Sequence, residues 1–281
     1  MGKYFGTDGF RGEANVNLTA DHAFKVGRFL GWYYTQLKRR NGSDGPARIV
    51  IGKDTRRSSY MFEYSLVGGL VASGADAYLL HVTTTPSVAY VVRTDGFDCG
   101  IMISASHHPY YDNGIKLING SGEKMDESII SLVEAYIDGE LVAFDRQWDE
   151  LPLARKELIG RTVDYVSGRN RYIGYLISLG MYSFKGLKVV LTAPTVLPGT
   201  LQRTSSMHWV PRPTSSMQIP TATISTPMPV LPILRCCRSM SSKTVWTWAL
   251  HTTVMPTAAC AWMKRATSSP ATTFCTSMVS I

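Results

Sequence analysis

A serine followed by two histidines stands directly after a short apolar run, and this segment is the best equipped for chemistry. Residues 99–103 read CGIMI, a predicted buried strand, and residues 104–109 continue as SASHHP. A serine beside a histidine at a strand end, as Ser106 is beside His107, suits a nucleophile or a phosphoryl carrier. A serine-rich turn before a proline explains the same residues equally well. A metal site is the weakest interpretation, because adjacent histidines on a loop rarely point at one ion.

The segment GTDGFRG at residues 6–12 combines closely spaced glycines with one arginine, Arg11. Glycines let the backbone approach a ligand closely, and a guanidinium pairs well with a phosphate group. Taken alone, a tight turn with a surface arginine is the simpler interpretation.

A second basic segment, GKDTRRSS at residues 52–59, follows another predicted strand. Basic and hydroxyl side chains at the carboxyl end of a strand suit an anion site in an open α/β sheet. Ser58 or Ser59 is also expected to cap the helix that follows, and the two interpretations are compatible.

The segment DNGIK at residues 112–116 contains Asn-Gly, a dipeptide typical of hairpin turns. We therefore predict a turn at Asn113-Gly114. This turn would return the chain so that Lys116 approaches the Ser106 loop.

The elements that must position these segments alternate between strands and helices up to residue 191. Thr19 is the predicted N-cap of a first helix, because apolar residues recur at helical spacing from Ala23 to Leu37. Further helices are expected at 61–73, 87–93, 127–137 and 164–180, and strands at 48–52, 77–82, 99–103, 115–118 and 187–191. The pattern predicts an α/β fold, a mixed sheet with helices on both faces, followed by the start of a second α/β domain.

The composition changes abruptly at Leu191. The net charge of +8 over 281 residues would ordinarily indicate a polyanion partner. Up to Leu191, however, 22 basic residues nearly balance 21 acidic ones, whereas residues 192–281 hold seven basic residues and no acidic one. The same tail holds ten of the 14 prolines and one of the 24 glycines. Because the excess charge belongs to this unusual tail, we expect no nucleic-acid partner.

The sequence also indicates no membrane partner. No stretch approaches the roughly 20 apolar residues needed to cross a bilayer. The first residues, MGKYFGTDG, lack the apolar run of a secretory signal. We expect a cytoplasmic protein.

Together the four segments are far more specific than any one of them. The start TDGFRG, the loop GKDTR, and SASHxP followed by DNGIK resemble the α-D-phosphohexomutase superfamily in order and spacing. Within it, the GTDG form of the first motif is similar to the phosphoglucosamine mutases rather than the phosphomannomutases. The resemblance covers residues 1–191, less than half of the usual four-domain chain.

The resemblance implies a phosphoryl carrier at Ser106 and a hexosamine phosphate as substrate. Glucosamine 6-phosphate and glucosamine 1-phosphate would interconvert through a phosphoserine and a bisphosphate intermediate. The other residues carried over are His107 and Lys116 as general acid or base, Arg11 as the catalytic cation near the phosphate, and Thr7, Asp8 and Arg56 as phosphate- or substrate-binding groups. His108 departs from the family, which usually has asparagine there.

The implied cofactor is Mg²⁺, bound by the phosphate on Ser106 and by three aspartates of a DGDxDR loop. No aspartate follows residue 191, so this chain cannot supply that loop. Codons can nevertheless be chosen for residues 253–260 (TVMPTAAC) that, read one base earlier, spell DGDADRCL. The same offset turns residues 192–198 (TAPTVLP) into DCANGAA. We therefore interpret the tail as frameshifted; the alternative is a natural Ser/Thr/Pro-rich basic tail.

Three regions follow from these observations. We expect residues 1–155 to form phosphohexomutase domain 1, residues 156–191 to form the truncated start of domain 2, and residues 192–281 to lack a packed core. The leading hypothesis is a phosphoglucosamine mutase whose present chain is an inactive truncated form, because the magnesium-binding acids are missing. The alternatives are a phosphomannomutase or phosphoglucomutase, and a non-catalytic phosphate-binding remnant. The sequence indicates no oligomeric state.

Overall fold

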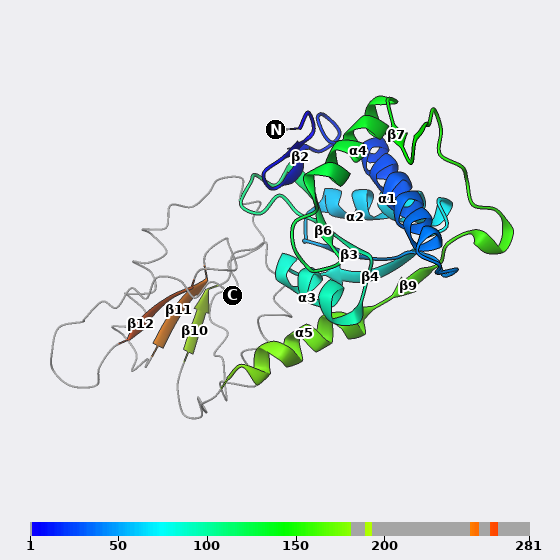
Figure 1. Cartoon of the computed structure of the whole chain (residues 1–281). Helices are drawn as coiled ribbons and strands as arrows, with labels where there is room; N and C mark the ends of the chain where they lie inside the picture. The colour runs from blue at the N-terminus through cyan, green and yellow to red at the C-terminus, as the bar shows by residue number, and fades with distance from the viewer. Residues whose placement is uncertain (1, 181–188, 193–247, 253–258, 264–281) are drawn as a thin grey trace, which may run out of the picture. The chain divides into compact units, whose positions relative to one another are not determined.

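The computed structural model describes residues 2–180, 189–192, 248–252 and 259–263 (Figure 1). The chain divides into two compact units, Met1–Tyr172 and Ile173–Ile281. The first unit contains all four of the segments singled out above. Within the described ranges, no helix is both long and apolar enough to cross a membrane.

A seven-stranded mixed sheet forms the centre of the first unit, in the order β1-β2-β6-β5-β3-β4-β9. Its strands are β1 Phe5–Gly6, β2 Gly9–Glu13, β3 Arg48–Lys53, β4 Asp76–Val82, β5 Cys99–Ile103, β6 Asp112–Asn119 and β9 Thr162–Asp164. Strands β5, β3, β4 and β9 run parallel, and β6 runs antiparallel to both of its neighbours, β5 and β2. The carboxyl ends of β3, β4 and β5 therefore meet at one edge of the sheet.

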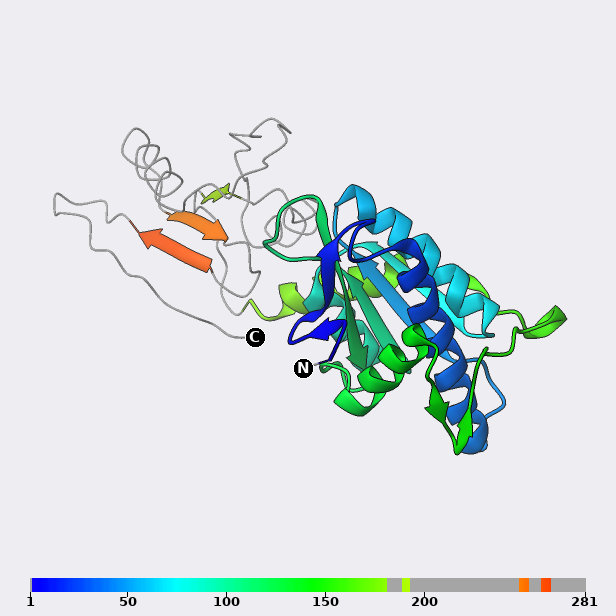
Figure 2. The ribbon, with the colours of Figure 1, turned by 90° about the horizontal axis from the view of Figure 1, so that it is seen from above.

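Helices cover both faces of this sheet, as the sequence predicts. They are α1 Ala20–Arg40, α2 Arg57–Ala72, α3 Thr85–Asp95, α4 Glu127–Asp138 and α5 Val166–Ser178. Successive residues of a strand point to opposite faces, so Ile49 and Ile51 pack with α1, α2 and α4, whereas Val50 packs with α3. The view in Figure 2 looks onto the side that α1 and α2 cover.

Most helices and strands of this unit lie where the sequence predicts them. Thr19 is the N-cap of α1, and its Oγ1 accepts a hydrogen bond from the His22 N–H at 3.3 Å. The helix α2, in contrast, begins four residues earlier than expected, with Arg56 at the N-cap and no side-chain cap. The predicted cap at Ser58 or Ser59 is wrong, because both residues lie inside the first turn of α2.

The predicted turn at Asn113-Gly114 is also wrong. Both residues lie within β6, where Asn113 pairs with Gly12 and Gly114 pairs with Arg11 of β2. The Asn113 side chain is completely buried and donates to the hydroxyls of Ser58 and Ser59 at 2.8 and 2.9 Å. Pairing with β2 and this buried amide hold the segment extended and so override the local turn preference of Asn-Gly.

The first unit extends beyond the expected boundary at residue 155. Strand β9 pairs in parallel with β4, so residues 162–164 belong to the first sheet. Two minor elements precede it, a hairpin of β7 Val142–Ala143 and β8 Arg146–Gln147, and a 3-10 turn at Lys156–Leu158.

The second unit contributes a three-stranded sheet of β10 Val189–Thr192, β11 Trp248–Thr252 and β12 Ala259–Met263. The first of these strands begins at Val189, two residues after the start of the strand expected at 187–191. The prediction that residues 192–281 lack a packed core falls largely outside the described residues.

The helices α1 and α2 approach one another most closely at two glycines. A Cβ atom at Gly69 would lie 2.3 Å from the main-chain oxygen of Phe24, and one at Gly27 would lie 2.4 Å from the main-chain oxygen of Leu66. Gly68 differs from its neighbour, because a Cβ there would meet only the Phe24 ring at 3.8 Å. The close approach of the two helices therefore depends on Gly27 and Gly69.

We predict that Gly69→Ala lowers the free energy of unfolding by about 1–3 kcal/mol, because the new methyl group would press on backbone that cannot yield. Gly68→Ala is the matched control; it gains up to about 1 kcal/mol of helix propensity without a clash. Urea unfolding followed by circular dichroism measures both. A Gly69→Ala protein as stable as the wild type would contradict this account of the helix contact.

Candidate functional site

Two of the predicted segments meet at the edge where the parallel strands end. The Ser106 loop, residues 104–111, connects β5 to β6, and residues 54–56 connect β3 to α2. The main-chain N–H of Asp54 donates to the Ile103 carbonyl at 3.0 Å, which fixes the two connections side by side.

Ser106 has a left-handed backbone conformation, with φ of +56°. Its main-chain N–H donates to the Ser104 hydroxyl at 3.1 Å, and Ser104 is itself buried and anchored to the Gly114 carbonyl at 2.8 Å. Residues other than glycine rarely adopt this conformation, and such outliers gather at functional sites where the surroundings hold them in place. The geometry therefore singles out Ser106 from the other serines of the loop.

Arg56 is buried beneath this loop and donates every one of its guanidinium hydrogens to protein oxygens. The acceptors are Asp54 Oδ2 at 2.9 Å for Nε, the Pro109 carbonyl and the Asp112 carbonyl at 3.1 Å for Nη1, and the Ser106 and His108 carbonyls, both at 2.9 Å, for Nη2. The sequence places Arg56 among the phosphate- or substrate-binding residues. In the structure, four of its five donors bind main-chain carbonyls of residues 106–112 and the fifth binds Asp54.

The other basic residue expected at an anion site here, Lys53, also points inward. It is buried and forms an ion pair with Glu63 of α2. Only Thr55 and Arg57 of segment 52–59 are well exposed. The segment therefore supports the loop rather than offering a row of free cations.

Arg11 of β2 lies within a chain of polar contacts that runs from Asp8 to Asp112. Its Nη2 donates to Asp8 at 2.7 Å, and its Nη1 lies 3.1 Å from His108 Nε2. His108 Nδ1 lies 3.1 Å from Asp112 Oδ2. A guanidinium can only donate, so His108 Nε2 must accept and its proton must be on Nδ1, facing Asp112. The histidine that replaces the expected asparagine thus links Arg11 to the Ser106 loop.

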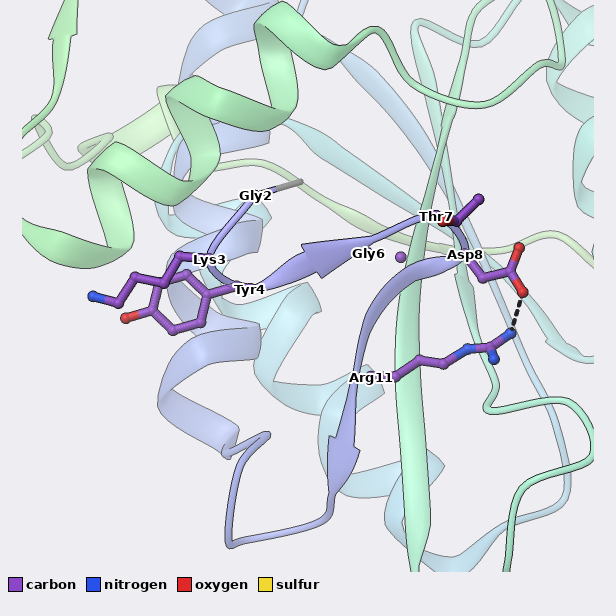
Figure 3. Close-up of a pocket in the computed structure, with 8 residues that line it drawn as sticks. Gly2, Lys3, Tyr4, Gly6, Thr7, Asp8 and Arg11 are labelled. Atoms are coloured by element: carbon purple, nitrogen blue, oxygen red, sulfur yellow. Dashed lines mark hydrogen bonds and ion pairs between the residues drawn. The ribbon is translucent and has the colours of Figure 1, made fainter.

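Thr7, Asp8 and Arg11 line a shallow hollow of about 420 Å³ at the N-terminal hairpin of the sheet. Figure 3 shows the Asp8 and Arg11 side chains directed toward one another, with Lys3 and Tyr4 on the opposite side. The side chains of Lys3 and Tyr4 both donate hydrogen bonds to Asp138, at 2.7 Å. The structure thus brings together the three residues predicted from the first motif.

His107 and Lys116 complete the predicted set. His107 is exposed, and its ring centroid lies 5.2 Å from that of His108. Lys116, in β6, is half-buried, and burial together with the neighbouring Arg11 charge lowers the pKa of its amine below the usual value. A lysine with a lowered pKa is better able to take up and release a proton near neutral pH.

The described residues do not offer a set of ligands that fits Mg²⁺. They contain no group of three or more His, Cys, Asp or Glu that could hold a metal ion. The three carboxylates around the loop, Asp8, Asp54 and Asp112, each contact Arg11, Arg56 or His108 instead. Magnesium needs several oxygen ligands, so these residues alone do not make its site.

The sequence did not identify Asp54, Ser59 and Asn113 as site residues, although they form the polar support under the loop. Ser59 donates to Asp54 at 2.6 Å and accepts from Asn113 at 2.9 Å. Their only signal was their presence inside the segments GKDTRRSS and DNGIK. Their function as buried partners depends on contacts between residues about 55 positions apart, which sequence spacing does not show.

We predict that Lys116→Met raises the free energy of unfolding at pH 7, on the order of 1 kcal/mol, because it removes a disfavoured buried charge. The lowered pKa means that the unfolded chain binds the proton more tightly. The gain should therefore shrink as pH rises from the folded pKa toward 10.5, where the amine is neutral in both states. Lys124→Met is the control, since Lys124 is exposed and paired with Glu127. A loss of stability on Lys116→Met would contradict the conclusion that the folded protein disfavours the charge on Lys116.

We also predict that neutral His108 carries its proton on Nδ1. Nitrogen chemical shifts of the imidazole, recorded in labelled protein at about pH 8 where a histidine is ordinarily neutral, distinguish the two tautomers. Arg11→Gln is the informative variant, because it removes the cation that requires Nε2 to accept. A proton on Nε2 in the wild-type protein would show that the Arg11–His108 contact is absent.

Comparison with known proteins identifies the family of the chain. Residues 2–142 match the family model described as phosphoglucomutase/phosphomannomutase, alpha/beta/alpha domain I. Among curated proteins, the chain is 69% identical over 203 residues to a phosphoglucosamine mutase of Lachnospira eligens and 61% identical over 215 residues to one of Lachnoclostridium phytofermentans. These alignments cover 72% and 75% of this chain but 43% and 45% of the relatives, so the chain spans less than half of their length.

Two solved structures share the fold. One is a phosphoglucomutase/phosphomannomutase family protein from Burkholderia thailandensis, with 18% identity, a TM-score of 0.66, and coverage of 88% of this chain and 51% of that one. The other is parafusin, a phosphoglucomutase from Paramecium, with 15% identity, a TM-score of 0.60, and coverage of 93% and 53%. Together with the family model, which matches half of the chain, these findings show that the chain belongs to the phosphohexomutase superfamily, through its α/β/α domain I.

Proposed function

We propose that this chain is the front part of a phosphoglucosamine mutase, a cytoplasmic enzyme that interconverts glucosamine 6-phosphate and glucosamine 1-phosphate. The observation that carries the proposal is the 69% identity to a protein of that name. The constrained Ser106 loop supports it, because a phosphoryl carrier must be held in one geometry to be approached from a fixed direction.

In this proposal Ser106 carries the phosphoryl group. The P–O bond to Ser106 Oγ breaks as a sugar hydroxyl attacks phosphorus. The proton of that hydroxyl passes to a general base, and Ser106 Oγ takes up a proton from a general acid. The bisphosphate formed returns its other phosphoryl group to Ser106. His107 and Lys116 are the proposed acid and base, and the lowered pKa of Lys116 suits that function.

Arg11 supplies positive charge beside the reacting group, and Thr7 and Asp8 shape the hollow next to it. Phosphoryl transfer gains most from positioning and from neutralising the charge on the phosphate oxygens. Asp8 and His108 hold the guanidinium from two sides, which fixes its direction. Mg²⁺ would add further neutralisation in a complete enzyme, where the phosphate on Ser106 would be one of its ligands.

We further propose that residues 192–281 are translated in a shifted reading frame. Support comes from the absence of acidic residues in the tail and from the recovery of DGDADR at residues 253–258 by a one-base offset. A chain without these aspartates keeps the serine loop but lacks the acids that complete a magnesium site. On this proposal the 281-residue chain is a phosphate-binding remnant without turnover.

A second candidate is a phosphomannomutase or phosphoglucomutase. The family description and the titles of the two solved structures name these activities. The choice between them depends on how the sugar is held.

We predict no mutase activity above background from the 281-residue chain, and activity from a gene in which the missing base is restored. Both proteins are assayed with glucosamine 6-phosphate, mannose 6-phosphate and glucose 6-phosphate. Ser106→Ala in the restored protein is the control and should abolish turnover. Activity in the 281-residue chain would refute the account of the tail, and a restored enzyme that prefers mannose or glucose phosphate would favour the second candidate.

A further inference from the structure

The Ser106 loop is oriented by a single buried cation. Three main-chain carbonyls of the loop and that of Asp112, the first residue of β6, converge on Arg56, and together with Asp54 they use all five guanidinium donors. An arginine in this state has no hydrogen left to donate to a phosphate oxygen. Its charge is also matched by the Asp54 carboxylate, which is only 2% exposed.

The carbonyl directions determine where the loop N–H groups point. In a trans peptide unit the C=O and the following N–H point in opposite directions, and the described residues contain no cis peptide bond. The Ser106 and Pro109 carbonyls face Arg56, so the N–H groups of His107 and Tyr110 face away from it. Neither N–H has a hydrogen-bond acceptor among the described residues, and both residues are exposed.

The arginine is itself fixed from below. Asp54 accepts from the Arg56 main-chain N–H at 3.0 Å and from the Ser59 hydroxyl at 2.6 Å. Ser59 in turn accepts from Asn113 of β6, the strand that follows the loop. Arg56 is therefore fixed by Asp54 on its own connection, and Asp54 is linked through Ser59 to Asn113 of β6. Such a buried network makes a rigid support for the loop.

We propose that Arg56 is a positioning residue for the Ser106 loop and not a phosphate ligand. By holding the loop carbonyls inward, it turns the His107 and Tyr110 N–H groups outward as donors to a phosphate group. That this phosphate is the one carried by Ser106 rests on the proposed function. The orientation of the loop does not rest on the proposed function. The loop proposal and the proposed function can therefore fail separately.

The chain offers a matched control in Arg28. This arginine is also buried and also donates to main-chain carbonyls, those of Ala72, Leu151 and Pro152, far from the Ser106 loop in sequence. Lysine at either position keeps the charge but loses the planar set of five donors.

The first test compares amide hydrogen exchange in the full-length wild type, Arg56→Lys and Arg28→Lys, together with their urea unfolding midpoints. We expect Arg56→Lys to speed exchange in residues 104–112 by about tenfold or more, as bonds to a charged group are lost. Arg28→Lys should speed exchange near residues 151–154 and leave the Ser106 loop unchanged. Equal acceleration throughout the chain, or no acceleration in residues 104–112, would overturn the proposal.

The second test needs only the wild-type protein and so does not depend on a variant that folds. Inorganic phosphate is titrated into the labelled full-length chain while the amide signals and the Arg56 Nε signal are followed by NMR. We expect the His107 and Tyr110 amides to shift and Arg56 Nε to stay in place. A shift of Arg56 Nε, or amides of His107 and Tyr110 that do not respond, would overturn the proposal. Failure of mutase activity in the restored enzyme would leave this result intact.

Discussion

The site depends on the need to satisfy a group of main-chain carbonyls that would otherwise be left without donors. Carbonyls from Ser106 to Asp112 turn toward the interior at the end of β5, and one guanidinium supplies their hydrogen bonds. A buried arginine is costly unless its charge and all its donors are matched, and here both conditions are met. The left-handed conformation of Ser106 is then a consequence of the loop path that these bonds impose.

The parallel strands explain why the two partners meet. Strands β3 and β5 are neighbours in the sheet, so the connection that carries Arg56 and the one that carries Ser106 leave the same edge side by side. Strand β6 returns antiparallel to β5 and places Asn113 under both connections. The N-terminal hairpin adds Arg11 through its pairing with β6. Three regions far apart in sequence thus form one polar cluster without any long loop.

Much of this could be read from sequence, and the errors have physical causes. Strand β5 was predicted with its observed bounds, because a continuous apolar run between turn residues is typical of a buried strand. Asn113-Gly114 was mistaken for a turn, because the local preference of the dipeptide is overridden by pairing with β2. The resemblance implied that Arg56 binds phosphate or substrate, and nothing in the sequence spacing shows that its carbonyl acceptors lie some 50 positions away. Local patterns predict elements, whereas the partners of buried polar groups depend on topology.

On our proposal, a preformed serine loop is joined to a tail whose magnesium-binding acids were lost by a shift in reading frame. Sequencing the coding DNA from the codon of Val189 to that of Cys260 tests this most directly. We expect the bases that encode residues 253–258, read one base earlier, to spell DGDADR, with a single missing base near the codon of Leu191. Codons that yield no aspartates in that frame would contradict the proposed frameshift. Residues 192–281 would then be a natural Ser/Thr/Pro-rich basic tail.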